Sequence, residues 1–360
     1  MQDLKFSKIR GVVAFSISHV LFPYHHILRK LAIPFSITFM NYVVTYRCNS
    51  RCIMCNIWKK NPQPDELSLA EIDTLFSNRL LSKLTWIQLS GGEIFLRNDI
   101  GDIIKLIANK LPKIKIYIAT NGYMFQKIDR VLSTLDSNIR ERLTIGVSID
   151  GIGKTHDKIR GINGAFVLVQ KTLEILTKYP EVHRNISMTL LSTNYAELEK
   201  VRDLAQKTGS SFGFQVENIS ESYFENINQQ NDLRNGIGRI KSYLSQLKMT
   251  EFGYKNKFYI NGCIKYLNTN KKQVKQVIPC FSGFTSFMLD PYGNVFPCLV
   301  FQKKVGNIRE QNFDEIYRSY TFKQVRREIS KGKCPGCWLA CEIGQSEKED
   351  WLLHPKMTLY

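Results

Sequence analysis

Short runs of β-branched and aromatic residues alternate with amphipathic segments from about residue 38 to residue 216. The runs predict strands over 38–46, 86–90, 114–119, 143–149, 186–191 and 212–216. The segments between them predict helices, with a capping box at Ser68 and Glu71, an N-cap at Asn98, another helix from Asn194, and an apolar face of Phe166, Val169, Leu173 and Leu176. This alternation predicts an α/β fold with a parallel sheet. Six βα units predict a partial (β/α)6 TIM-type barrel.

The pattern changes after about residue 220, where polar, basic helical segments and then a Gly-, Pro- and Cys-rich stretch follow. A stretch of this size with five cysteines indicates a region held together by metal. The predicted organisation is a basic, partly apolar helical extension over 1–37, the barrel over 38–224, a basic linker or insertion over 225–279, a small Cys-rich domain over 280–345 and a tail over 346–360.

The 50 basic and 32 acidic residues give the chain a formal net charge of +18. Such a charge indicates acidic partners, although a solvated basic surface explains any single patch equally well. No basic motif interleaved with aromatic residues, as in RNA-binding modules, is present. The charge therefore favours anionic metabolites or membrane surfaces over nucleic acid.

The first 36 residues contain two apolar runs, neither of which reaches the ~20 residues of a membrane span. They also lack a small-residue cleavage site of a signal peptide. Two interpretations remain open. Residues 4–36 form a helical pair that packs on the main domain, or an interfacial helix with Lys5, Lys8, Arg10, Arg29 and Lys30 facing anionic lipid. Both predict a cytoplasmic protein, the second one peripheral at the inner face of the membrane.

Nine cysteines, an odd number in tight groups, favour metal ligation in a reducing compartment over disulfides. Cys48, Cys52 and Cys55 are separated by gaps of three and two residues, and no fourth Cys or His lies nearby. A structural zinc ion requires four closed ligands. Thiolates also hold iron–sulfur clusters. Three thiolates predict a cluster with one open iron, which can bind a further ligand.

Two more motifs directly follow predicted strands, at the face where α/β folds bind ligands. One is Ser90-Gly91-Gly92-Glu93 and the other runs from Ser148-Ile-Asp-Gly to His156-Asp-Lys-Ile-Arg160. With the cysteine triplet they resemble the radical S-adenosylmethionine (radical SAM) enzymes. The resemblance covers residues 38–345. It implies a [4Fe-4S] cluster on Cys48, Cys52 and Cys55, and SAM contacts from Gly91, Gly92, Glu93, Ser148, Arg160, Met54 and Asn121. In that scheme Gly91–Glu93 hold the SAM amino group, Ser148 the ribose and Arg160 the carboxylate, whereas His156 and Asp157 are loop and helix-cap residues.

The C-terminal cysteines are similar to the SPASM and twitch modules, which bind auxiliary iron–sulfur clusters. Cys280, Gly293 and Cys298 match the shared Cys-x(9–15)-Gly-x4-Cys opening. Only five cysteines are present instead of seven, which favours one auxiliary cluster, of the [4Fe-4S] or [2Fe-2S] type, on Cys280, Cys298, Cys334 and Cys337. Cys341 replaces one of these or is free. A zinc site remains an alternative, and Cys263 is interpreted as a buried free thiol.

The resemblance implies reductive cleavage of SAM to a 5′-deoxyadenosyl radical, which removes a hydrogen atom from a substrate carbon. An auxiliary cluster favours an oxidative modification. The implied partners are a one-electron reductant such as flavodoxin or ferredoxin, and a peptide or an anionic or lipid-linked metabolite as substrate. The catalytic acid or base is not predicted. The alternative is a non-enzymatic protein that binds zinc and nucleic acid.

Overall fold

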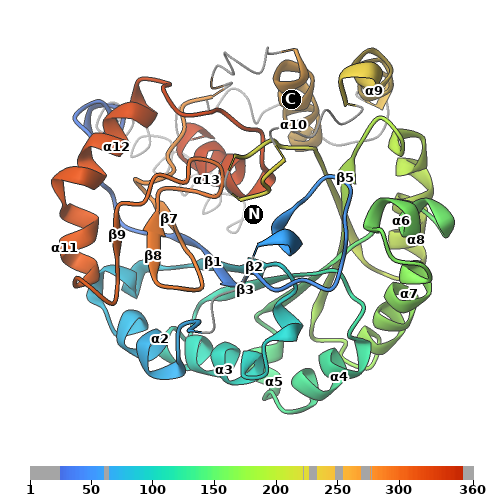
Figure 1. Cartoon of the computed structure of the whole chain (residues 1–360), viewed down its shortest axis with the longest axis horizontal. Coiled ribbons are helices and arrows are strands. Elements are labelled where there is room, and N and C mark those ends of the chain that lie inside the picture. Colours follow the sequence, from blue (N-terminus) through green and yellow to red (C-terminus); the bar gives the residue numbers. More distant parts are fainter. Residues whose placement is uncertain are drawn as a thin grey trace, which may run out of the picture.

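The computed structural model describes residues 25–60, 65–221, 223–226, 233–247, 254–268, 276 and 278–351. Strands and helices form a ring in which parallel strands lie inside an arc of helices (Figure 1). The partial barrel predicted from the sequence is confirmed. In the described part of the chain, no helix combines the length and apolar character that crossing a membrane requires.

One nine-stranded sheet has the order β6-β5-β4-β3-β2-β1-β7-β8-β9. The six barrel strands are mutually parallel, and β7 also runs parallel to β1 on its other side. β8 and β9 complete the sheet as antiparallel strands. The bounds are β1 (Phe39–Thr45), β2 (Trp86–Gly91), β3 (Lys115–Thr120), β4 (Leu143–Ser148), β5 (His183–Leu190), β6 (Ser211–Val216), β7 (Ser286–Leu289), β8 (Asn294–Phe296) and β9 (Gly306–Asn307).

Helices cover the outside of this sheet because each buries one apolar stripe against the strands. In α7 the predicted face of Phe166, Val169, Leu173 and Leu176 is buried. The barrel helices are α2 (Leu69–Phe76), α3 (Ile100–Lys110), α4 (Phe125–Ser133), α5 (Ser137–Arg140), α6 (Lys154–Arg160), α7 (Ala165–Leu176) and α8 (Leu198–Lys207). Short 3-10 helices are η1 (Ile57–Lys59), η2 (Arg79–Lys83), η3 (Ile94–Leu96) and η4 (Tyr195–Glu197).

Two predicted helix starts differ from the structure, whereas the capping box of Ser68 and Glu71 is present at α2. The N-cap of α3 is Asp99 instead of Asn98, and the Asn98 side chain accepts a hydrogen bond from Lys127 Nζ. The segment after Asn194 begins as the 3-10 helix η4 before α8. The Asn194 amide bonds instead to the β4 and β5 ends, which explains why it does not cap the helix.

The C-terminal region contains more helix than its short-stranded sequence predicts. α11 (Phe313–Arg318) and α12 (Tyr320–Ser330) follow β9, and α13 (Ala340–Trp351) comes last. The basic segment before this region contains α9 (Leu233–Leu247) and α10 (Tyr254–Leu267). The division into domains stays a prediction. Since β7 pairs with β1, the sheet is continuous across the proposed boundary at residue 280.

Part of the predicted N-terminal extension can be placed. Residues 25–30 are helical, and Phe35 packs against the rings of Phe281 and Phe284. The Arg29 side chain is buried, so the prediction that it faces lipid is wrong. The predicted lipid-facing residues Lys5, Lys8 and Arg10 lie outside the described residues.

Candidate functional site

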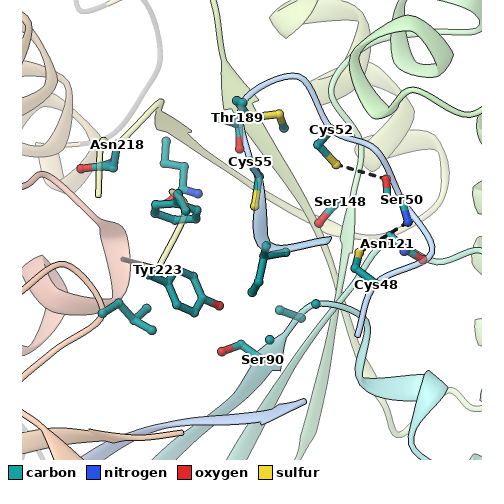
Figure 2. A pocket seen from close by; sticks show the side chains of 18 of the residues that line it. Cys48, Ser50, Cys52, Cys55, Ser90, Asn121, Ser148, Thr189, Asn218 and Tyr223 are labelled. Atoms are coloured by element: carbon teal, nitrogen blue, oxygen red, sulfur yellow. Dashed lines mark hydrogen bonds between the residues drawn. The ribbon is translucent and has the colours of Figure 1, made fainter. Parts of the chain in front are cut away.

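A cavity of about 210 Å³ lies at the carboxyl ends of the barrel strands. It combines the loop after β1 with the ends of β2 to β6 and with parts of the C-terminal region (Figure 2). The predicted site residues that line it are Cys48, Cys52, Met54, Cys55, Gly91, Gly92, Asn121, Ser148, Arg160 and Cys341. The parallel sheet therefore brings together motifs that are up to about 290 positions apart.

The loop carrying Cys48, Cys52 and Cys55 is fixed by backbone hydrogen bonds to its surroundings. Arg51 N–H donates to the carbonyl of Arg160 at 2.9 Å, and Asn56 N–H donates to that of Phe224 at 2.8 Å. Burial raises the pKa of Cys48 to about 11 and that of Cys55 to about 12. Without a cation these two thiols are protonated, so metal binding must release protons.

The donor set fits an iron–sulfur cluster, because Cys48, Cys52 and Cys55 have no fourth Cys or His nearby in the sequence and so leave one iron open. A cubane distributes its thiolates over separate iron atoms, so its ligands lie farther apart than those of one zinc ion. In the same cavity the buried Ser90 hydroxyl neighbours Tyr223 but has no aligned hydrogen-bond partner within the described chain. A thiol triplet beside an unsatisfied polar group fits a cluster with a polar ligand next to it.

Gly91 and Gly92 are required by the close approach of the chain after β1. A Cβ at either position would lie 2.1 Å from a backbone oxygen, of Thr45 or of Arg47 respectively. Gly91 also has φ +141°, which favours glycine. The structure does not bring the Glu93 carboxylate into the cavity. It is fully buried and accepts hydrogen bonds from Phe95 N, Thr120 Oγ1 and Asn121 N.

Arg160 is held by a buried ion pair. Its Nε lies 2.7 Å from Asp150 Oδ2, and its Nη1 lies 3.7 Å from Cys52 Sγ. Burial lowers the pKa of Arg160, but the charge of Asp150 outweighs this and raises it above the usual value. Arg160 is therefore a permanent cation in the wall of the cavity, beside Ser148 of β4. An arginine in this position suits a ligand carboxylate.

His156 lies in helix α6, so the prediction that it is a loop residue is wrong, whereas Asp157 has a helix-capping role as predicted. His156 Nδ1 accepts a hydrogen bond from the Asp150 backbone N–H at 3.2 Å. Asp157 accepts from the N–H groups of Gly164 and Phe166, both at 2.8 Å, at the start of α7. Asn121 forms the predicted turn, in which its Oδ1 accepts from Tyr123 N–H, and its Nδ2 donates to Asn49 in the cysteine loop.

The later cysteines form a second group, and Cys298, Cys337 and Cys341 share one buried apolar cluster with Cys48 and Cys55. Cys280 interacts electrostatically with Cys334, and Cys337 with both Cys280 and Cys334. Cys298 interacts with Cys337 and Cys280. Burial raises the pKa of Cys280 to about 11. These couplings connect the four cysteines that are predicted to form the auxiliary site.

Cys341 and its neighbour Glu342 extend from the second group toward the first. Cys341 lines the cavity of the first triplet, with Leu299 and Leu339. Glu342 is buried, accepts hydrogen bonds from Asn41 of β1 and from Ser282, and has its pKa raised to about 7 by burial. Cys263 is fully buried in α10, outside both groups.

Several residues that line the cavity were missed by the sequence reasoning. Thr189 and Gln215 lie at the ends of β5 and β6, and Asn218 and Tyr223 follow β6. Figure 2 shows Tyr223 across the cavity from the cysteine loop. The alternation of side chains at strand ends could have indicated Thr189 and Gln215. No local pattern marks Tyr223, because its position depends on the fold of the loop.

The radical SAM superfamily model matches residues 42–205, and the model of the iron–sulfur cluster-binding domain called SPASM matches residues 280–341. The chain belongs to the radical SAM superfamily and has a C-terminal SPASM domain. It is an enzyme whose cofactors are a [4Fe-4S] cluster with SAM and auxiliary iron–sulfur chemistry in the SPASM region. The alternative of a non-enzymatic zinc and nucleic-acid-binding protein is therefore wrong.

Individual relatives are distant. The chain is 24% identical to the antilisterial bacteriocin subtilosin biosynthesis protein AlbA of Bacillus subtilis, over 82% of this chain and 66% of that protein. It is 26% identical to the AdoMet-dependent heme synthase of Methanosarcina barkeri, over 82% of this chain and 86% of that protein. The fold is similar to Streptococcus suis SuiB bound to S-adenosylmethionine, with a TM-score of 0.60, 15% identity and coverage of 83% of this chain and 70% of SuiB.

Proposed function

We propose that the chain is a maturase that abstracts a hydrogen atom from a carbon of a peptide substrate and gives an oxidative modification. The observation that carries this proposal is the shared cavity. One space is lined by Cys48, Cys52 and Cys55 and also by Leu299, Leu339 and Cys341 of the SPASM region. A substrate in this cavity touches both parts of the protein at once.

We assign the first cluster to Cys48, Cys52 and Cys55, which leave one iron without a protein ligand. Gly91, Gly92, Ser148, Arg160, Met54 and Asn121 line the same wall and would hold SAM. Four cysteines, Cys280, Cys298, Cys334 and Cys337, would hold one auxiliary cluster. When bound, the first cluster and SAM supply a 5′-deoxyadenosyl radical, and the auxiliary cluster supplies an acceptor for the electron that an oxidised substrate gives up.

The protein contributes position and exclusion of water. Arg160, fixed by Asp150, presents a permanent cation for the SAM carboxylate. Buried apolar side chains of Ile57, Leu299 and Leu339 complete the walls, and they keep water from a reactive radical. Glu93 does not line the cavity, but its carboxylate accepts a hydrogen bond from Asn121 N–H and so holds the Asn121 turn close to the end of β2.

The names of the relatives support a peptide as substrate. AlbA is named for bacteriocin biosynthesis, and SuiB has been solved with the precursor peptide SuiA. The heme synthase shows by its name that related chains also have other products. An anionic or lipid-linked metabolite is the second candidate, which the net charge of +18 favours. That charge also suits an acidic one-electron reductant such as flavodoxin or ferredoxin.

Anaerobic reconstitution with iron, sulfide, dithionite and SAM tests the proposed chemistry. We expect 5′-deoxyadenosine from the unmodified protein and none from Cys48→Ala. Cys263→Ala is the matched control, since Cys263 is a buried thiol outside both sites, and it should retain the activity. Equal amounts of 5′-deoxyadenosine from Cys48→Ala and the unmodified protein would refute the assignment. Faster formation with a peptide than with a lipid-linked substrate would decide the substrate class.

A further inference from the structure

Arg29 is a buried cation. The residue is 7% exposed, and among the described residues no Asp or Glu lies within ion-pair distance of it. A buried charge without a counter-ion is strongly unfavourable, and proteins normally pair it. Negative charge close to Arg29 therefore stabilises the folded protein.

The groups that Arg29 contacts are neutral and belong to the SPASM region. Its Nε donates to the carbonyl of Cys280 at 2.9 Å, and its Nη2 donates to Gln276 Oε1 at 3.1 Å and to the Ile329 carbonyl at 3.4 Å. The guanidinium also lies 5.8 Å from the centre of the Phe281 ring. These contacts orient the cation but leave its charge uncompensated.

Gln276 connects the cation to a cysteine. Arginine can only donate, so Gln276 must turn its oxygen toward Arg29 and its amide nitrogen away. That nitrogen donates to Cys334 Sγ at 3.3 Å and to the Ile329 carbonyl at 2.8 Å. Cys280 and Cys334, the two cysteines nearest this arrangement, interact electrostatically with each other and with Arg29. Burial lowers the pKa of Arg29, and both cysteines oppose this.

We propose that Arg29, together with Gln276, is the buried counter-ion of the auxiliary cluster and raises its reduction potential. This inference rests on the proposed assignment of Cys280, Cys298, Cys334 and Cys337. Thiolate ligands give the site net negative charge, and each added electron increases it by one. Net charge and hydrogen bonds to the sulfurs are the protein's means of setting a cluster potential. A nearby cation and an N–H donor to sulfur both favour the reduced state, which suits an electron acceptor.

The expected effect is large enough to measure. At an effective dielectric constant of about 20, a unit charge within about 12 Å changes a one-electron equilibrium roughly tenfold. Tenfold corresponds to about 59 mV for a one-electron couple. Arg29 acts on the cluster through its charge, so Arg29→Lys should keep the ratio of reduced to oxidised cluster at a given potential within about twofold of that of the unmodified protein. Arg29→Gln keeps a donor for the Cys280 carbonyl but loses the charge.

The test uses the full chain with Cys48, Cys52 and Cys55 replaced by alanine, so that only the auxiliary cluster remains. Redox titration followed by electron paramagnetic resonance gives its midpoint potential. We expect Arg29→Gln to lower the ratio of reduced to oxidised cluster at a given potential about tenfold, and Gln276→Leu to lower it by a smaller factor. The control is Arg140→Gln in α5, which removes the ion-pair partner of Glu181 and should leave the midpoint potential unchanged.

Each outcome of the redox titration either supports or overturns the inference about Arg29. A change of less than twofold in Arg29→Gln overturns the inference, as does an equal loss of cluster in Arg29→Lys and Arg29→Gln, which would mark a merely structural role. Loss of the cluster in Arg29→Gln alone supports it, because Gln keeps the donor to the Cys280 carbonyl and lacks the charge, whereas Lys keeps the charge and lacks a donor at that atom. If the alanine background binds no iron–sulfur cluster, the proposed auxiliary site itself fails. That result is distinct from a cluster whose potential does not respond to Arg29.

Discussion

Replacing Asp150 by asparagine should destabilise the protein far more than loss of an ordinary ion pair. Asp150 is completely buried at the end of β4, and its two carboxylate oxygens have separate partners. Oδ1 accepts from Thr189 N–H at 2.8 Å, and Oδ2 pairs with Arg160 Nε at 2.7 Å. An amide at this position can keep the first contact only by turning its NH2 group toward Arg160, so that one donor faces another.

The expected cost is about 3 to 5 kcal/mol, because the change leaves a buried guanidinium without its counter-ion. Urea unfolding followed by circular dichroism measures it, with linear extrapolation to zero denaturant. The control is Glu328→Gln, which breaks the exposed pair with Lys303 and should cost no more than about 1 kcal/mol. We also expect weaker binding of SAM by calorimetry, since Arg160 lines the cavity.

A double-mutant cycle with Arg160→Met separates the pair from its surroundings. If the reasoning is right, the double variant loses clearly less stability than the sum of the single variants, because removing both charges leaves none unpaired. A cost of less than about 1 kcal/mol for Asp150→Asn, or strictly additive effects, would refute it.

Three further predictions follow from the described contacts. Gly92→Ala should lose about 2 kcal/mol or more in urea unfolding, since its Cβ would lie 2.1 Å from a backbone oxygen, whereas Gly213→Ala, with open space, should not. Burial lowers the pKa of His156 to about 3, below its unfolded value of about 6.5, so its stabilising contribution should be complete above about pH 6.5 and fall by ~3 kcal/mol toward pH 4. The free energy of unfolding, measured at each pH, should depend less steeply on pH in His156→Asn than in the unmodified protein. An equal slope in the two proteins would contradict this prediction. Cys341→Ser should keep the auxiliary iron, whereas Cys337→Ser should lose about two iron atoms per chain by iron analysis for a [2Fe-2S] cluster or about four for a [4Fe-4S] cluster. Loss in both would place Cys341 among the ligands.

The barrel was predictable because its signals are local. Each strand is a short β-rich run next to a helix with one apolar face, and the cysteine triplet and the Gly91-Gly92 pair directly follow such runs. What the sequence could not give was contact across the sheet. Nothing near Glu93 indicates that its carboxylate bonds to the Asn121 turn. Similarly, Arg29 looks like one of several N-terminal cations, and only the folded chain places it against Cys280. Both cases depend on residues that are distant in sequence, where periodicity carries no information.

The pairing of β7 with β1 has a consequence for synthesis on the ribosome. Residues near position 40 find their second neighbour only near position 287, so β1 remains an open edge after the six barrel strands have emerged. About 70 residues separate β6 from the end of β7, which corresponds to roughly 4 to 15 seconds of translation. This first strand, which is buried along its whole length in the folded protein, therefore waits unpaired on one side, where exposed edges favour aggregation. Cys298, Cys334 and Cys337 follow β7 in the chain, so the proposed auxiliary site is complete only after the strand that closes this edge has been synthesised.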